Sequence, residues 1–264
     1  MEKLREKKLF LLDMDGTIYL DNDLFDGTID FLEYVKKIGG RYLFLTNNSS
    51  KSVSKYVEKL KSLGIESTAD DFLTSVDATK AYIGKKYNKI YVLGTKSLKE
   101  DLRESGYNIV DKLEDGIDCL LMGFDTELSF QKLEDACILL NKGIDYIATN
   151  PDYVCPTWYG FVPDCGSVAD MLYNATKRRP YFVGKPEPDM VNLAIEKTGY
   201  KREETVIIGD RVYTDIACGV NAGISSILVL SGESTLEDVE KNEKKPTYIL
   251  KDIKTLYEFL KENK

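Results

Sequence analysis

Two aspartates separated by one residue follow a short apolar run near the start of the sequence. The run Leu9–Leu12 leads into Asp13 and Asp15, and Gly16 and Thr17 follow, which predicts a strand that ends at a turn. Open α/β sheets place their ligand crevice at the carboxyl ends of the strands. Carboxylates there can hold Mg²⁺ together with a substrate phosphate, and one can act as a nucleophile that forms an aspartyl-phosphate. An acidic turn with an Asx hydrogen bond explains the same residues.

A second apolar run, Tyr42–Leu45, leads into Thr46 and Asn47. A hydroxyl, an amide and free backbone N–H groups at a strand end can bind phosphate oxygens. The same residues also fit an ordinary helix N-cap. We therefore treat Thr46 and Asn47 as candidate phosphate ligands.

Lys185 follows the apolar run Tyr181–Val183 and precedes Pro186. Its ammonium group can offset the charge of a phosphate or of nearby carboxylates, although a single lysine is more often solvated. The spacing is not that of a P-loop, which has a glycine further upstream and a Ser or Thr after the lysine.

The fourth candidate is Asp210, which follows the apolar run Val206–Ile208 and Gly209. It would complete a three-carboxylate metal site with the two aspartates of the first strand. Asp215 could bind the metal, could pair with Lys185 without touching the metal, or could be a favourable acidic residue in the first turn of the next helix. We favour the last two roles. Four strand ends together predict one acidic, metal-bearing phosphate pocket.

Strand-length apolar runs alternate with helix-length amphipathic runs along the chain, which predicts a mostly parallel sheet with helices on both faces. The expected strands are Lys8–Leu12, Arg41–Leu45, Ile90–Leu93, Cys119–Gly123, Tyr146–Ala148, Tyr181–Val183, Thr205–Ile208, Ile227–Leu230 and Tyr248–Leu250. The expected helices are Gly27–Ile38, Ser52–Leu63, Ser97–Ser105, Ser129–Asn141, Val168–Lys177, Asp189–Thr198, Ile216–Ala222 and one from Ile253. The charged stretch Glu237–Lys245 is read as a solvated helix end or a loop.

Composition limits the chemistry. The 264 residues carry a net charge of −8 with dispersed lysines, which argues against a nucleic-acid partner, and the absence of histidine excludes His-based catalysis and His metal sites. Five scattered cysteines predict neither a disulfide framework nor a zinc site. No apolar run suggests a signal peptide or a membrane span, so we expect a cytoplasmic protein without membrane association.

These motifs resemble those of the haloacid dehalogenase (HAD) superfamily, and more closely its NagD-type, p-nitrophenylphosphatase-like subclass IIA. The motifs are Asp13–Thr17, Thr46, Lys185 and Asp210 with Asp215, and Ala148–Asp152 and Gly184–Pro186 also fit the subclass. The resemblance implies a Rossmann-like, doubly wound α/β core with an α/β cap domain inserted between the second and third motifs. We expect core residues 1–78 and 180–264 and a cap at 79–179.

The resemblance also implies a mechanism. Asp13 would attack phosphorus, and Asp15 would protonate the leaving oxygen and later deprotonate water. Mg²⁺ would be held by Asp13, Asp210 and the backbone carbonyl of Asp15. Thr46 and Lys185 would bind the transferring group, and the substrate would be a small phosphorylated metabolite. The subclass also suggests a homo-oligomer formed through the cap.

Other readings remain open. Phosphomutases and phosphotransferases of the same superfamily share these residues. Phosphorylated receiver modules, which are binding switches, also gather acids, a Thr and a Lys at strand ends. Within the cap, Asn150–Tyr153 and Trp158–Phe161 are candidates for substrate selection, and Trp158 would either stack on a substrate ring or pack against the protein.

Overall fold

The computed structural model describes residues 2–50, 52–157 and 159–262. Its contacts divide the chain into two compact units. The first comprises Met1–Thr46, Val53–Leu73 and Lys185–Lys264, and the second comprises Asn47–Ser52 and Thr74–Gly184. The chain therefore enters the second unit directly after Thr46 and leaves it for the last time directly before Lys185. The chain returns to the first unit at Val53 and enters the second unit again at Thr74. The sequence-based boundaries fall after residues 78 and 179, five residues from the Leu73/Thr74 and Gly184/Lys185 crossings.

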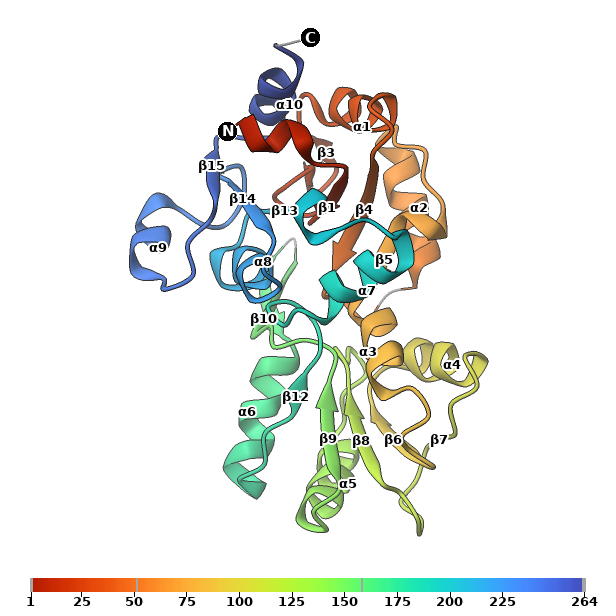
Figure 1. Ribbon diagram of the computed structural model, residues 1–264. Helices are drawn as coiled ribbons and strands as arrows, with labels where there is room; N and C mark the ends of the chain where they lie inside the picture. The colour runs from red at the N-terminus through yellow and green to blue at the C-terminus, as the bar shows by residue number, and fades with distance from the viewer. Residues whose placement is uncertain (1, 51, 158, 263–264) are drawn as a thin grey trace. The chain divides into compact units, whose positions relative to one another are not determined.

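The first unit is built on a six-stranded sheet in the order β15-β14-β13-β1-β4-β5 (Figure 1). Its central strand β1 runs parallel to β13 on one side and β4 on the other, with Leu12 opposite Ile208 and Phe44. The strands are β1 (Leu9–Leu12), β4 (Arg41–Thr46), β5 (Phe72–Thr74), β13 (Thr205–Gly209), β14 (Ser225–Val229) and β15 (Tyr248–Leu250), and β2 (Tyr19–Leu20) and β3 (Asp23–Leu24) form a separate hairpin.

Helices cover both faces of this sheet. Alternate strand residues such as Phe10, Phe44 and Ile208 belong to one large core cluster that also contains residues of α1, α2 and α10. On the opposite face, Gly219 of α8 packs against Ile207. The helices are α1 (Thr28–Lys37), α2 (Val53–Ser62), α7 (Asp189–Thr198), α8 (Ala217–Asn221), α9 (Leu236–Lys241) and α10 (Ile253–Lys261), with 3₁₀ helices at Glu2–Glu6, Ala69–Asp71 and Arg202–Glu204 and a π-helical turn at Val212–Ile216.

The second unit contains a five-stranded parallel sheet in the order β12-β9-β8-β6-β7 and a separate antiparallel hairpin, β10-β11. One face of the sheet packs on α5 and α6 through a core that includes Leu120, Ala136 and Leu172. The elements are α3 (Ser75–Ile83), β6 (Ile90–Leu93), α4 (Lys96–Glu104), β7 (Ile109–Val110), β8 (Cys119–Met122), α5 (Phe130–Asn141), β9 (Asp145–Ala148), β10 (Val154–Thr157), β11 (Gly160–Pro163), α6 (Cys165–Thr176) and β12 (Tyr181–Phe182).

The predicted Rossmann-like, doubly wound α/β architecture with an inserted α/β domain is confirmed. Continuous burial explains why β1, β4 and β13 were predictable, since strands covered on both faces read as unbroken apolar runs. Among the residues that the structure describes, no helix combines the length and apolar character needed to span a bilayer.

Candidate active site

Three neighbouring strands end at the same edge of the first unit's sheet. Asp13 directly follows β1, and its backbone N–H donates to the carbonyl of Ile208 at 2.9 Å. Thr46 is the last residue of β4, and Asp210 directly follows β13. Because β13, β1 and β4 are adjacent and parallel, the topology brings Asp13, Thr46 and Asp210 to one carboxyl edge.

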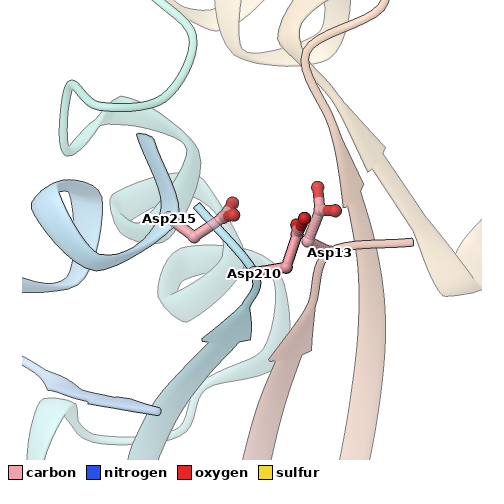
Figure 2. Close-up of side chains that lie close together, drawn as sticks. All are labelled: Asp13, Asp210 and Asp215. Carbon is pink, nitrogen blue, oxygen red and sulfur yellow. The ribbon is translucent and has the colours of Figure 1, made fainter. Parts of the chain in front are cut away.

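Three carboxylates converge at this edge. Asp13, Asp210 and Asp215 each offer an oxygen, and these oxygens all lie within 4.8 Å of one another. Figure 2 shows the two strand-end side chains beside each other and Asp215 reaching toward them from the turn at Val212–Ile216. The side chain of Asp13 is 18% exposed, whereas that of Asp215 is fully buried. Of Asp13 and Asp215, therefore, Asp13 is the one that a substrate can reach.

Lys185 links two members of the cluster. Its Nζ donates to Oδ1 of Asp13 at 2.5 Å and to Oδ1 of Asp215 at 2.6 Å, and its side chain is only 3% exposed. Burial by itself would lower the pKa of Lys185, but Asp13 and Asp215 outweigh that effect and raise it. The ammonium group therefore stays charged and holds one oxygen of Asp13 in place.

The loop that follows β14 holds Asp210 in place. Its Oδ2 accepts from the backbone N–H of Glu233 at 2.7 Å, and its carbonyl accepts from the N–H of Ser234 at 3.1 Å. Gly232 and Gly16 both lie against its side chain, and a β-carbon at either position would overlap the carboxylate. Sequence reasoning missed this loop, because it contributes backbone groups and empty space rather than a ligand side chain.

The electrostatics of the cluster fit a divalent cation. Burial raises the pKa of Asp13 well above its usual range, and Asp215 and Asp210 add to the rise. Burial and Asp215 also raise the pKa of Asp210 to about 6. The three carboxylates outnumber the nearby cations, which are the ammonium of Lys185 and the guanidinium of Arg211, so the cluster has an excess of negative charge. Oδ1 of Asp210 is buried without a hydrogen-bond partner among the described residues, so one ligand oxygen is available.

The second aspartate of the first motif lies outside this cluster. The carboxylate of Asp15 contacts Tyr19 and Lys59, with its Oδ2 3.3 Å from the Tyr19 hydroxyl and its Oδ1 3.6 Å from Nζ of Lys59. Its side chain is 52% exposed. Asp15 is thus free of the metal cluster and accessible to a substrate oxygen.

The two candidate phosphate ligands after β4 are placed in different units. Thr46 is buried at the end of β4 in the first unit. Asn47 belongs to the second unit, where its Nδ2 lies 3.2 and 3.3 Å from the two carboxylate oxygens of Asp152. Its carbonyl accepts from Nδ2 of Asn150 and from Oγ of Ser75. The side chain of Asn47 therefore helps to fix the chain segment that follows Thr46.

The candidates for substrate selection fall in or next to the β10-β11 hairpin. Tyr159 and Phe161 are 64% and 69% exposed. Trp158 lies outside the described residues. Asn150 and Asp152 are engaged with Asn47, as given above.

Two family models and several known proteins match this chain. A family model for haloacid dehalogenase-like hydrolases matches residues 10–108, and a HAD-hydrolase-like model matches residues 182–256. The chain is 35% identical over 252 residues to an acid sugar phosphatase of Staphylococcus aureus, covering 95% of this chain and 96% of the relative.

Solved structures agree. A 4-nitrophenylphosphatase from Thermotoga maritima matches with a TM-score of 0.91 at 42% identity, over 97% of this chain and 98% of the other. A glycerol phosphate phosphatase from Mycobacterium tuberculosis, solved with calcium, matches with a TM-score of 0.89 at 28% identity, over 96% of this chain and 76% of the other. The chain therefore belongs to the haloacid dehalogenase superfamily and is a phosphatase of its NagD-type, nitrophenylphosphatase-like subclass IIA.

Proposed function

We propose that this phosphatase hydrolyses small phosphate monoesters through an aspartyl-phosphate on Asp13 and that Mg²⁺ is its cofactor. The observation that carries the proposal is the pairing of an accessible carboxylate, Asp13, with the buried ammonium of Lys185 beside two further carboxylates. A lysine placed in this way keeps one oxygen of Asp13 fixed, while the other oxygen can attack.

Two chemical steps follow from the roles of Asp13 and Asp15. In the first, a carboxylate oxygen of Asp13 forms a bond to phosphorus as the ester P–O bond breaks, and protonated Asp15 gives its proton to the leaving oxygen. In the second, Asp15 takes a proton from water, whose oxygen attacks phosphorus. The bond to Asp13 then breaks, inorganic phosphate leaves and Asp15 is again protonated.

The cation would be held by Asp13, Asp210 and the backbone carbonyl of Asp15. Asp215 would pair with Lys185 instead of binding the cation. When bound, a divalent ion neutralises phosphoryl charge and draws the substrate to the nucleophile. The unpaired Oδ1 of Asp210 and the excess negative charge of the cluster support this assignment. The glycerol phosphate phosphatase was solved in complex with calcium, which supports a divalent ion as the cofactor.

Substrate phosphate would be bound by Lys185 and by the hydroxyl of Thr46. Sugar phosphates are the first substrate class to test, since one relative is an acid sugar phosphatase. We place the protein in the cytoplasm, in keeping with its five scattered cysteines, and expect no nucleic-acid or membrane partner, in keeping with its net charge of −8 and its short apolar runs.

Release of inorganic phosphate from p-nitrophenyl phosphate and a panel of sugar phosphates, with Mg²⁺ and then with EDTA, tests the proposal. We expect turnover that EDTA abolishes. Mass spectrometry of a rapidly quenched reaction should show one added phosphate on the peptide that contains Asp13, and D13N should show none. Metal-independent turnover, or transfer of phosphate to a second hydroxyl instead of water, would contradict the proposal.

A further inference from the structure

The turn after β1 places a buried tyrosine beside Asp15. The N–H of Gly16 donates to the carbonyl of Tyr19 at 2.8 Å, and the N–H groups of Thr17 and Ile18 donate to the carbonyl of Met14 at 3.1 and 3.0 Å. These bonds fold residues 14–19 into one compact turn. Tyr19 therefore has its position fixed by the backbone that also carries the catalytic motif.

The hydroxyl of Tyr19 is a dedicated donor to Asp15. Its ring is fully buried in the core of the first unit, and its Oη lies 3.3 Å from Oδ2 of Asp15. A phenol hydroxyl donates a hydrogen bond and a carboxylate accepts one, so Tyr19 can donate to Asp15.

A second group reaches Asp15 from a different element. Nζ of Lys59, on α2, lies 3.6 Å from Oδ1 of Asp15 and 3.9 Å from the centre of the Tyr19 ring. The ring thus supports the ammonium by a cation–π contact. The two oxygens of Asp15 are contacted by two groups on separate elements, which together define the orientation of the carboxylate.

We propose that Tyr19 and Lys59 are positioning residues that hold Asp15 in the orientation required for proton transfer. The inference rests on the proposed role of Asp15 as proton donor and acceptor. An exposed ion pair such as Asp15–Lys59, with side chains 52% and 31% exposed, contributes little to stability. Its main consequence is therefore the placement of a carboxylate that must meet the leaving oxygen in one step and water in the next.

Leaving-group dependence separates positioning from a merely structural role. The alcohol oxygen of an alkyl phosphate such as a sugar phosphate needs a proton as it leaves, whereas p-nitrophenolate leaves readily without one. We expect Tyr19→Phe and Lys59→Met each to lower kcat/KM for the alkyl phosphate about 10- to 100-fold, which is at most the lower end of the about 10²–10⁴-fold that general acid–base catalysis supplies. The loss with p-nitrophenyl phosphate should stay below about 3-fold, and Lys59→Arg should recover part of the lost activity.

Matched controls exist on α1. Tyr34→Phe removes a hydroxyl that donates to the carbonyl of Leu260 at 3.1 Å, and Lys36→Met removes an ammonium that lies 5.3 Å from the centre of the Tyr42 ring. Both control variants should leave the ratio of the two kcat/KM values unchanged.

The outcomes are distinguishable. Equal losses on both substrates, or no loss on either, would overturn the positioning role while wild-type turnover leaves the proposed function standing. A wild-type protein that hydrolyses neither ester would overturn the proposed function and this inference with it. Both variants are mild, since Tyr19→Phe keeps the buried ring and Lys59→Met keeps an unbranched side chain at a partly exposed position.

Discussion

Oδ1 of the fully buried Asp215 lies 2.6 Å from Nζ of Lys185. The same carboxylate accepts from the backbone N–H of Arg211 at 3.2 Å through its other oxygen. Asp215 therefore fixes the ammonium group that in turn holds Asp13.

Asp215→Asn should weaken both activity and stability. Loss of one anionic partner of a buried ammonium leaves Lys185 less well placed, so we expect kcat to fall about 10- to 100-fold and the free energy of unfolding to fall by about 1–3 kcal/mol. Steady-state kinetics and urea unfolding measure the two effects. Asp26→Asn, at a side chain that is 88% exposed, is the control and should change neither.

Asp13→Asn should separate activity from stability. It removes the proposed nucleophile and should abolish turnover. Burial and the neighbouring acids raise the pKa of Asp13 well above its usual range, so the folded state disfavours its charged form, and the metal-free variant should unfold at no lower free energy than the wild type. Equal residual activity in the Asp13 and Asp215 variants would contradict the separate roles that we assign.

Gly232→Ala should displace Asp210 and weaken metal binding. A β-carbon at position 232 would overlap the Asp210 carboxylate, and Gly16 lies against the same carboxylate, so the side chain has little room to move. We expect the Mg²⁺ concentration for half-maximal activity to rise at least about 10-fold, in line with the about 10- to 100-fold cost of disturbing groups that orient a metal ligand. Gly39→Ala is the control. Its φ of +68° brings backbone strain but nothing lies within 4 Å, so stability alone should fall.

Divalent metal should stabilise the fold through Asp210. A ligand present at about 100 times its Kd adds about 2.7 kcal/mol to the free energy of unfolding. Mg²⁺ should therefore raise the thermal unfolding midpoint of the wild type, and Asp210→Asn should remove most of that rise. The Asp26→Asn control should keep it, and a rise of equal size in all three proteins would rule out metal binding at this cluster.

The second unit should lose stability as the pH rises through about 6. Burial raises the pKa of Asp164, the N-cap residue of α6, from 3.8 to about 6, so its folded environment favours the protonated form. The stabilising effect is fully present below about pH 4 and is lost as the pH passes about 6, a change of roughly 2–3 kcal/mol. Urea unfolding across this range should show the slope in the wild type and a flatter profile in Asp164→Asn, which keeps a capping oxygen. Parallel profiles would contradict the assignment.

The parts of the site that could be predicted from the sequence are functional side chains that follow or end a predictable strand. Asp13, Thr46 and Asp210 each end a buried apolar run, and that pattern alone predicts a shared sheet edge. The loop that holds Asp210 has no comparable sequence pattern, because Glu233 contributes only a backbone N–H and Gly232 contributes only the absence of a β-carbon.

Elements outside the site were missed for other reasons. Helix α3 has weak apolar periodicity, although Thr74 and Asp77 form a capping box that could have indicated its start. Helix α9 lies where a solvated helix end or a loop was expected, and Thr235 and Asp238 form a similar capping box there. The β10-β11 hairpin has short strands with much exposed surface, so it lacks the alternation of buried and exposed residues that marks a strand.

The two glycines beside Asp210 also set the size of the acid that this position accepts. Glutamate has the same charge and the same ligand oxygens as aspartate, but its extra methylene would push the carboxylate into the backbone atoms of Gly16 or Gly232. Selection at position 210 therefore acts on length as well as on charge. We infer that glutamate at position 210, whose side chain is one carbon longer, would not form the same site.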